Sequence, residues 1–201
     1  MATAFVLGNG RSRLAITPEK LKDTGKIYAC NAVYRDFIPD YLIAVDAKMV
    51  IELTENGVQH KTEVWTNPNK KYQGFQGLHF FNPSKGWSSG PTALWLASVN
   101  TMNTFEPTKE IYILGFDYVG ANNNKYFNNV YADTKNYKRS VEPATFFGNW
   151  LTQTEQVIKE FKEIKYYRVI EKGTFNPEWK YSNLEHITYE EFKTRINYQN
   201  D

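Results

Sequence analysis

The sequence predicts an α/β protein: a single Rossmann-like three-layer domain with a mostly parallel sheet and helices on both faces. Three short apolar runs occur in the first fifty residues, and each ends at a glycine turn or a polar residue. Runs of this kind are typical of buried parallel strands. The length of 201 residues also fits one domain, which can bury a core without disulfides or bound metal.

The predicted strands lie at short apolar runs along the whole chain. They cover residues 4–7, 26–30, 41–45, 63–66, 78–81, 110–117 and 165–170. The first three are followed by Asn9, Asn31 and Asp46. The strand over 110–117 ends at Asp117. Ligands of open parallel sheets bind outside the carboxyl ends of the strands, so we expect these polar side chains to converge on one ligand.

Helices are predicted between the strands. A short helix follows Thr17, and longer ones cover residues 48–56, 93–100 and 143–162. A terminal helix begins within residues 187–192, where Thr188 and Glu191 form a capping box. The helix over 93–100 is opened by residues 88–92 (Ser-Ser-Gly-Pro-Thr), and small residues at a helix start leave backbone N–H groups open to an anion.

A polar segment over residues 118–142 has no convincing period. Irregular segments of this length in compact domains are usually lids or binding loops, so we expect a loop or lid here. Its tyrosines Tyr118, Tyr126 and Tyr131 either donate hydrogen bonds to a phosphate or pin the lid by packing. Residues 171–201 are predicted to form a C-terminal appendage to a single domain that spans residues 1–201.

Composition excludes several classes of protein. The formal net charge is +2 and no run of like charges occurs, so we expect no nucleic-acid partner. The one cysteine, Cys30, excludes an internal disulfide and a multi-cysteine zinc site, and we expect it to be buried. No signal peptide and no membrane span is evident, so a cytoplasmic protein is expected. The aromatic content of 16% leaves a homo-oligomer open.

Four segments in one order carry a resemblance to a known group of enzymes. They are residues 5–12 (FVLGNGRS), 28–31 (YACN), 89–94 (SGPTAL) and 110–118 (EIYILGFDY). Over about residues 4–170, the chain resembles the bacterial lipooligosaccharide sialyltransferases of glycosyltransferase family 42. It also resembles their neighbours, the motility-associated glycosyltransferases and the 6-hydroxymethylpterin diphosphokinase-like proteins.

The strand ends, the helix start and the resemblance together predict a nucleotide site. The predicted nucleotide-binding residues are Gly8, Asn9, Gly10, Ser12, Asn31, Asp46, Ser88, Ser89, Gly90 and Thr92. The resemblance implies that Asp117 borders the ribose and base, and that Tyr118 and Tyr126 brace the departing phosphate. The family's general base is a histidine that this chain lacks. Residues 139–143 stand at that position, and the three histidines lie elsewhere.

Three functions follow from these observations. The leading one is a glycosyltransferase-like enzyme that uses a CMP- or UDP-sugar donor, an acceptor that the sequence does not define, and no cofactor. Its base would be Asp46, Asp117 or Glu142. A diphosphokinase or other phosphate-transfer enzyme on the same scaffold would need Mg²⁺, with Asp46 and Asp117 as ligands. The absent histidine favours a third hypothesis, a non-catalytic protein that sequesters a nucleotide.

The strand-end residues also have a purely structural interpretation. Asn9 suits a turn between two glycines, because asparagine tolerates left-handed backbone. Asn31, Asp46 and Asp117 suit the N-caps of following helices. The sequence leaves both interpretations open for each residue.

Overall fold

The computed structural model describes residues 1–199 and contains one eight-stranded sheet, in which all neighbouring strands are parallel. The strand order is β5-β4-β3-β2-β1-β6-β7-β8. The predicted Rossmann-like α/β class is confirmed, and the sheet is wholly parallel. The strands are β1 (Ala2–Leu7), β2 (Lys26–Cys30), β3 (Tyr41–Ile43), β4 (Glu63–Thr66), β5 (Leu78–Phe80), β6 (Lys109–Leu114), β7 (Lys165–Ile170) and β8 (Leu184–Thr188).

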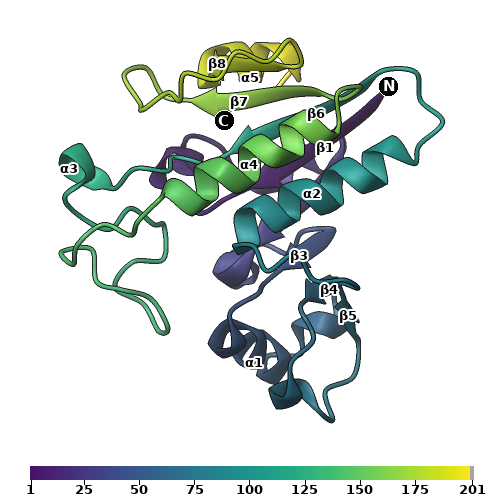
Figure 1. Ribbon diagram of the computed structural model, residues 1–201, viewed down its shortest axis with the longest axis vertical. Helices are drawn as coiled ribbons and strands as arrows, with labels where there is room; N and C mark the ends of the chain where they lie inside the picture. The colour runs from purple at the N-terminus through teal and green to yellow at the C-terminus, as the bar shows by residue number, and fades with distance from the viewer. Residues whose placement is uncertain (200–201) are drawn as a thin grey trace.

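Helices cover both faces of the sheet. Figure 1 shows α2 and α4 side by side across one face, with α1 near β3 and α5 beside β8. No helix in the described chain is both long enough and apolar enough to cross a bilayer. The α-helices are α1 (Ala47–Glu55), α2 (Ser89–Met102), α3 (Ala121–Asn124), α4 (Gly148–Glu160) and α5 (Tyr189–Arg195). The 3₁₀ helices are η1 (Arg11–Ala15), η2 (Pro18–Leu21), η3 (Asn31–Arg35), η4 (Val58–His60) and η5 (Lys70–Tyr72).

Strand β1 runs through the centre of the core and is buried on both faces. Phe5 and Leu7 point into the layer that holds α1, α5 and 3₁₀ helices, while Ala4 and Val6 point into the layer under α2 and α4. A strand buried on both faces is a continuous apolar run, which explains why residues 4–7 predicted a parallel strand.

The strand order reverses its direction at β1. Strands β2 to β5 lie on one side of β1, while β6, β7 and β8 lie on the other. Strands β1 and β6 pair in register through Leu7 and Leu114, so their carboxyl ends stop at the same level. Crevices of open α/β sheets form at such a switch point.

The C-terminal region differs from its prediction. The sequence analysis missed β8, which pairs with β7 as the last strand of the sheet. The terminal helix begins at Tyr189, so Ile187 belongs to the strand and not to the helix. The predicted capping box is confirmed: Thr188 Oγ1 accepts from the N–H of Glu191, whose carboxylate accepts from the N–H of Thr188. Strand β8 has only five residues and ends at the helix cap, so its alternation of apolar and polar residues is too short to be recognised in the sequence.

Residues 118–142, named the lid from here on, connect β6 to the segment before α4. The lid contacts the domain through a hydrogen bond from Val130 N to Asn9 O at 2.8 Å. The helix predicted over 143–162 begins at Gly148 instead. The reason is that Pro143 pairs with Tyr126 in an antiparallel bridge, which keeps the chain there extended.

Candidate functional site

A pocket of about 310 Å³ lies at the carboxyl ends of β1, β2 and β6, at the switch point of the sheet. This volume is at the lower end of the range for small-molecule sites. Its walls come from four strand ends (those of β1, β2, β3 and β6), the N-terminus of α2, the lid and α4. The lining residues are Gly8, Asn9, Gly10, Cys30, Asn31, Val45, Ser88, Ser89, Gly90, Pro91, Gly115, Phe116, Asp117, Tyr118, Val119, Asn128, Asn129 and Trp150.

Most of the predicted site residues meet in this pocket, but four do not line it. Ser12 lies behind the wall, where it binds Asp117, and it lines a neighbouring hollow. Asp46 caps α1 by accepting from the N–H of Lys48 at 2.8 Å, so the structural interpretation holds for it. Thr92 is buried in α2 and donates its hydroxyl to Ser88 O at 2.8 Å.

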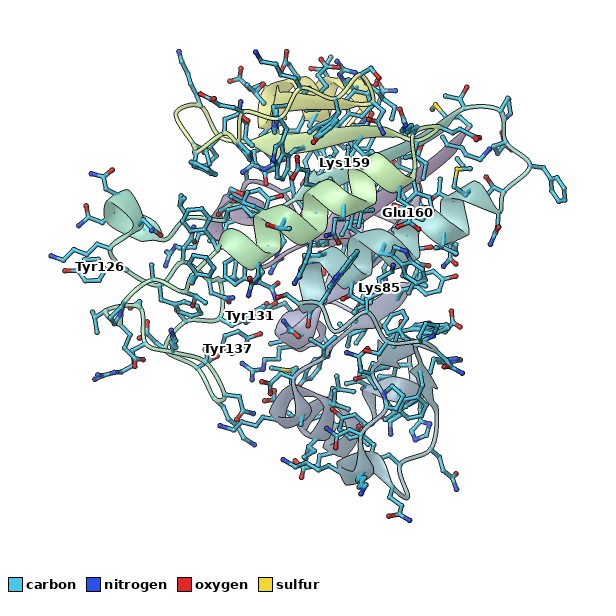
Figure 2. All side chains as sticks on the ribbon, viewed as in Figure 1. Lys85, Tyr126, Tyr131, Tyr137, Lys159 and Glu160 are labelled. Carbon is cyan, nitrogen blue, oxygen red and sulfur yellow. The ribbon has the colours of Figure 1, made fainter. Side chains whose placement is uncertain are left out.

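Tyr126 is the fourth of these residues. It belongs to the lid, where its backbone forms bridges to Ala121 and Pro143. Figure 2 shows it on the outer side of the lid, farther from α2 and α4 than Tyr131 and Tyr137 are. The structure therefore does not place Tyr126 together with Tyr118 at the pocket.

The turn at Gly8 and Gly10 packs against the end of β6. A Cβ on Gly8 would lie 2.7 Å from the carbonyl oxygen of Gly115, and one on Gly10 would lie 2.4 Å from the carboxyl group of Asp117. The N–H of Gly8 donates to Leu114 O and that of Gly10 to Gly115 O, at 2.8 and 2.9 Å. These glycines therefore allow two strand ends to approach each other, and their N–H groups are already engaged.

Asn9 and Asn31 line the same pocket but differ in how many of their side-chain polar atoms are already hydrogen-bonded. The side-chain amide of Asn9 donates to Cys30 O at 3.0 Å, and its oxygen accepts from Arg13, so Asn9 braces the β1 and β2 ends. Asn31 has a left-handed backbone with φ 55°, and its Oδ1 accepts from Ser89 Oγ at 3.0 Å. Its Nδ2 has no acceptor among residues 1–199, so it remains available to a ligand.

The N-terminus of α2 opens into the pocket without a side-chain cap. The Ser88 side chain makes no capping bond, and Pro91 has no N–H. The N–H groups of Ser89 and Gly90 have no acceptor in the described part of the chain. Helix α2 has 14 residues, so its dipole places partial positive charge at these two donors. They can hold one anionic group such as a phosphate.

Asp117 is the only carboxylate among the lining residues, and no Lys, Arg or His from residues 1–199 lines the pocket. Its oxygens accept from the hydroxyl of Ser12, from the Ser12 N–H at 3.1 Å and from Asn128 Nδ2 at 3.1 Å. The carboxylate therefore ties together η1, the β6 end and the lid. It does not act as a helix cap.

Tyr118 has an unusual backbone in the segment that follows β6, three residues beyond Gly115. Its φ is 63°, and the bond from Val119 N to Asp117 O at 2.8 Å closes a tight turn around it. Left-handed backbone is strained for a bulky residue, and such strain clusters at functional sites. The ring forms a wall of the pocket, whereas Oη is fully buried and has no hydrogen-bond partner within the described chain. Burial raises the pKa of Tyr118 to about 12, so the phenol is neutral at physiological pH.

Sequence reasoning missed Asn129 and Trp150. Asn129 comes from the lid, and its Oδ1 accepts from Tyr131 N at 2.8 Å. Trp150 comes from the first turn of α4 and supplies a flat, half-buried aromatic wall. Neither residue follows a predicted strand. Only the path of the lid and the packing of α4 on α2 bring them to the pocket.

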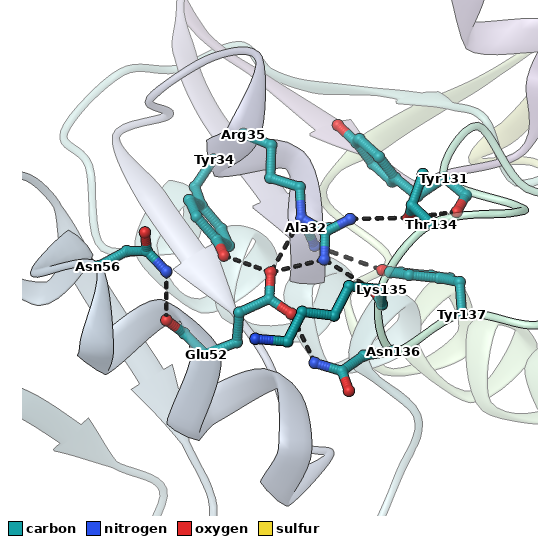
Figure 3. A network of polar contacts seen from close by, with 10 residues as sticks. All are labelled: Ala32, Tyr34, Arg35, Glu52, Asn56, Tyr131, Thr134, Lys135, Asn136 and Tyr137. Carbon is teal, nitrogen blue, oxygen red and sulfur yellow. Dashed lines mark hydrogen bonds and ion pairs between the residues drawn. The ribbon is translucent and has the colours of Figure 1, made fainter.

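A network of partly buried polar contacts holds the lid against α1 and η3 (Figure 3). The carboxylate of Glu52 accepts from Tyr34 Oη, from Arg35 Nε and Nη2 at 2.9 and 2.6 Å, and from Asn136 Nδ2 at 2.6 Å. Burial alone would raise the pKa of Glu52, but the bonds from Tyr34, Arg35 and Asn136 outweigh it and lower the pKa. Arg35 also donates to the backbone of Lys135, so one partly buried ion pair fixes this part of the lid.

Within residues 1–199, no group of three or more His, Cys, Asp or Glu side chains is placed to hold a metal ion. No family model matches the chain, and no curated protein or solved structure matches it either. The resemblance to the sialyltransferase-like group therefore rests on the four sequence segments alone. What the site does must be argued from its geometry.

Proposed function

We propose that the pocket binds a nucleotide-activated sugar of the CMP- or UDP-sugar class, and that the protein is a glycosyltransferase-like enzyme that releases the nucleotide. The observation that carries this proposal is the place of the pocket at the switch point, with the uncapped N-terminus of α2 opening into it. Dinucleotide and mononucleotide ligands of open α/β sheets bind at this point of the fold.

The lining groups suggest how such a donor would lie. A phosphate would accept from the N–H groups of Ser89 and Gly90, close to the free Nδ2 of Asn31. A base would stack on the ring of Trp150, since stacking on an aromatic side chain is worth about 1–3 kcal/mol. Partial positive charge at α2 would also stabilise the phosphate as it leaves.

Transfer to an acceptor needs a general base that takes the proton from the acceptor, and the residues that line the pocket reduce the number of candidate carboxylates. Of the three candidate carboxylates, Asp117 lines the pocket, while Asp46 and Glu142 do not. A carboxylate has about four lone-pair positions, and Asp117 uses three of them, so one remains for a proton. The diphosphokinase alternative required both Asp46 and Asp117 as metal ligands, and these two side chains do not share the pocket.

One observation favours the non-catalytic alternative. Three hydrogen bonds already engage the carboxylate of Asp117, which joins η1, the β6 end and the lid, so this side chain has a structural role without any catalysis. A protein that sequesters a nucleotide would use the same phosphate and base contacts without this base. Binding and turnover therefore have to be measured separately.

Binding is tested by thermal shift with CMP, UDP, GDP, ATP and their sugar conjugates. A ligand at 100 times its Kd stabilises the fold by about 2.7 kcal/mol, which raises the Tm of a domain of this size by roughly 5–10 °C. Asn31→Asp keeps the left-handed backbone and the acceptor for Ser89 but replaces the free donor with a negative charge. We expect it to weaken nucleotide binding at least about tenfold.

Asn197→Asp is the matched control, because Asn197 is exposed and also has a left-handed backbone with φ 52°. It should bind as the wild type does. If no nucleotide shifts the wild-type Tm, or if Asn31→Asp binds as tightly as Asn197→Asp, the site assignment is wrong.

Turnover is tested by donor hydrolysis and transfer with the nucleotide sugar that binds. Asp117→Asn preserves the shape of the carboxyl group and should retain binding while lowering turnover by about 100-fold or more, the usual contribution of a general base. Tight binding without any turnover by the wild type would refute the transferase proposal and support the sequestering protein.

A further inference from the structure

Two arginines lie directly behind the wall of the pocket, and both are almost fully buried. Arg168 is 1% exposed and Arg13 is 4% exposed. Arg168 donates from Nε and Nη2 to the carbonyl oxygen of Phe116, at 3.0 and 2.8 Å, and Phe116 lines the pocket. Arg13 donates from Nη2 to Asn9 Oδ1 at 3.5 Å, and Asn9 also lines the pocket.

Neither guanidinium group has a carboxylate oxygen within 4.0 Å in the described part of the chain. Arg168 is held by two carbonyl groups, those of Phe116 and Phe175, and by the face of the Tyr118 ring, 4.8 Å from Cζ. Arg13 Nε is buried and has no partner among these residues. Buried charges are normally paired, because removing an unpaired charge from water is costly.

The other charged groups nearby do not cancel these two charges. Arg13 reaches Asp36 only through the hydroxyl of Tyr131, and Asp36 is exposed, so water screens it. His186 is paired with Arg168 across β7 and β8, and burial and Arg168 lower its pKa to about 4, so it is neutral at physiological pH. Among the residues that line the pocket, the one charge is that of Asp117, whereas Glu171 and Arg11 line the neighbouring hollow.

The charges of Asp117, Arg13 and Arg168 together determine the net charge around the pocket. The lining residues alone carry one negative charge, from Asp117, which would repel a phosphate. Two buried positive charges stand one hydrogen bond behind the wall, in surroundings where water screens them little. The formal charges of Arg13, Arg168 and Asp117 sum to one positive charge, so the arginines offset the repulsion that Asp117 alone would exert on an anion.

We propose that Arg13 and Arg168 are specificity-determining residues, which make the pocket prefer a ligand with a charged phosphate to the same ligand without one. They act through the protein wall and not by contact with the ligand. The inference rests on the proposed function for the nucleotide class of the ligand. It goes beyond that function by assigning the selectivity for charge to two residues outside the pocket.

The expected effect follows from Coulomb's law. For two charges on the order of 8 Å apart at an effective dielectric constant of about 20, removing one charge changes the affinity for an anion by about tenfold once salt screening is included. An uncharged ligand has no net charge for the arginines to attract, so its affinity should change little in the same variants. The ratio of the two affinities therefore separates a charge effect from a loss of structure.

The experiment measures the Kd of CMP and cytidine, and of UMP and uridine, by titration calorimetry at low and high salt. The wild type should prefer each nucleotide to its nucleoside, and salt should reduce that preference. Arg168→Met and Arg13→Met should each lower the preference about tenfold, while Arg168→Lys, which keeps the charge, should retain most of it. Arg195→Met is the control, since Arg195 pairs with Glu185 at 3.3 Å on the exposed surface.

Arg168→Met leaves two carbonyl groups without donors, so Arg13→Met provides a second variant with a smaller change in structure. Equal losses of nucleotide and nucleoside affinity in both methionine variants would overturn the proposal, and so would a lysine variant that behaves like methionine. A wild type that binds neither nucleotides nor nucleosides would instead refute the proposed function. The two failures are therefore distinguishable.

Discussion

Replacing Glu52 with glutamine removes the charge at the centre of the contacts that hold the lid. The carboxylate is only 6% exposed and accepts from Tyr34, from two nitrogens of Arg35 and from Asn136. Removing one partner of a buried ion pair costs about 3–5 kcal/mol. The side chain of Arg35 is 22% exposed, so water recovers part of this loss. We expect Glu52→Gln to lower the free energy of unfolding by about 2–3 kcal/mol at pH 7.

This loss is measured by urea unfolding and by the Tm, which should fall by roughly 5–10 °C. Hydrogen exchange at residues 131–137 should accelerate, because these residues lose their anchor on α1. Glu55→Gln is the control, since Glu55 is exposed on the same helix. A difference between Glu52→Gln and the wild type below about 0.5 kcal/mol would refute the assigned role of the ion pair.

The pH dependence gives a second check on Glu52. Its pKa in the folded protein is lowered, so the unfolded chain takes up the proton first as the pH falls. The stability that Glu52 contributes is fully present above the unfolded pKa of about 4.5 and is lost as the pH falls through the folded value. The difference between wild type and Glu52→Gln should therefore be constant near neutrality and shrink below about pH 4.5.

Three further predictions concern other parts of the fold. Gly10→Ala should lower the free energy of unfolding by about 2 kcal/mol or more in urea, because its Cβ would lie 2.4 Å from Asp117; an unchanged midpoint would refute the close contact. Thr188→Ala should cost about 1 kcal/mol through loss of the capping box, and Thr194→Ala, on the same helix, should cost less. Burial and a nearby arginine lower the pKa of His186 to about 4, so the wild type should lose stability relative to His186→Leu as the pH falls from about 6.5 to 4, and parallel pH profiles would contradict this.

Much of the fold could be predicted from the sequence, because it depends on neighbours along the chain. A buried parallel strand needs a continuous apolar run, and residues 4–7 supply one. A capping box needs two residues three positions apart, and Thr188 and Glu191 supply it. The convergence of Asn9, Asn31 and Asp117 on one pocket also followed, since the carboxyl ends of parallel strands share one edge of the sheet.

The failures have a physical reason as well. Asp46 follows a strand like the others, but it caps the next helix because the chain turns into α1 at once. Tyr126 lies close to Tyr118 in sequence, yet the bridge between Tyr126 and Pro143 holds it on the lid. Local sequence does not specify this bridge, because it depends on a partner from another part of the chain.

The sequence by itself thus determined the parallel sheet, the edge of the sheet at which the pocket forms and half of the residues that line this pocket. Only the tertiary structure decided which of their polar groups remain free. The N–H groups of Gly8 and Gly10 donate to the end of β6, and the carboxylate of Asp117 is engaged by Ser12, 105 residues earlier in the chain. Among the pocket donors considered, those without an acceptor in residues 1–199 are the N–H groups of Ser89 and Gly90 and the Nδ2 of Asn31. A polar group forms its hydrogen bond with whichever partner folding brings near, and for Gly8, Gly10 and Asp117 that partner is distant in sequence.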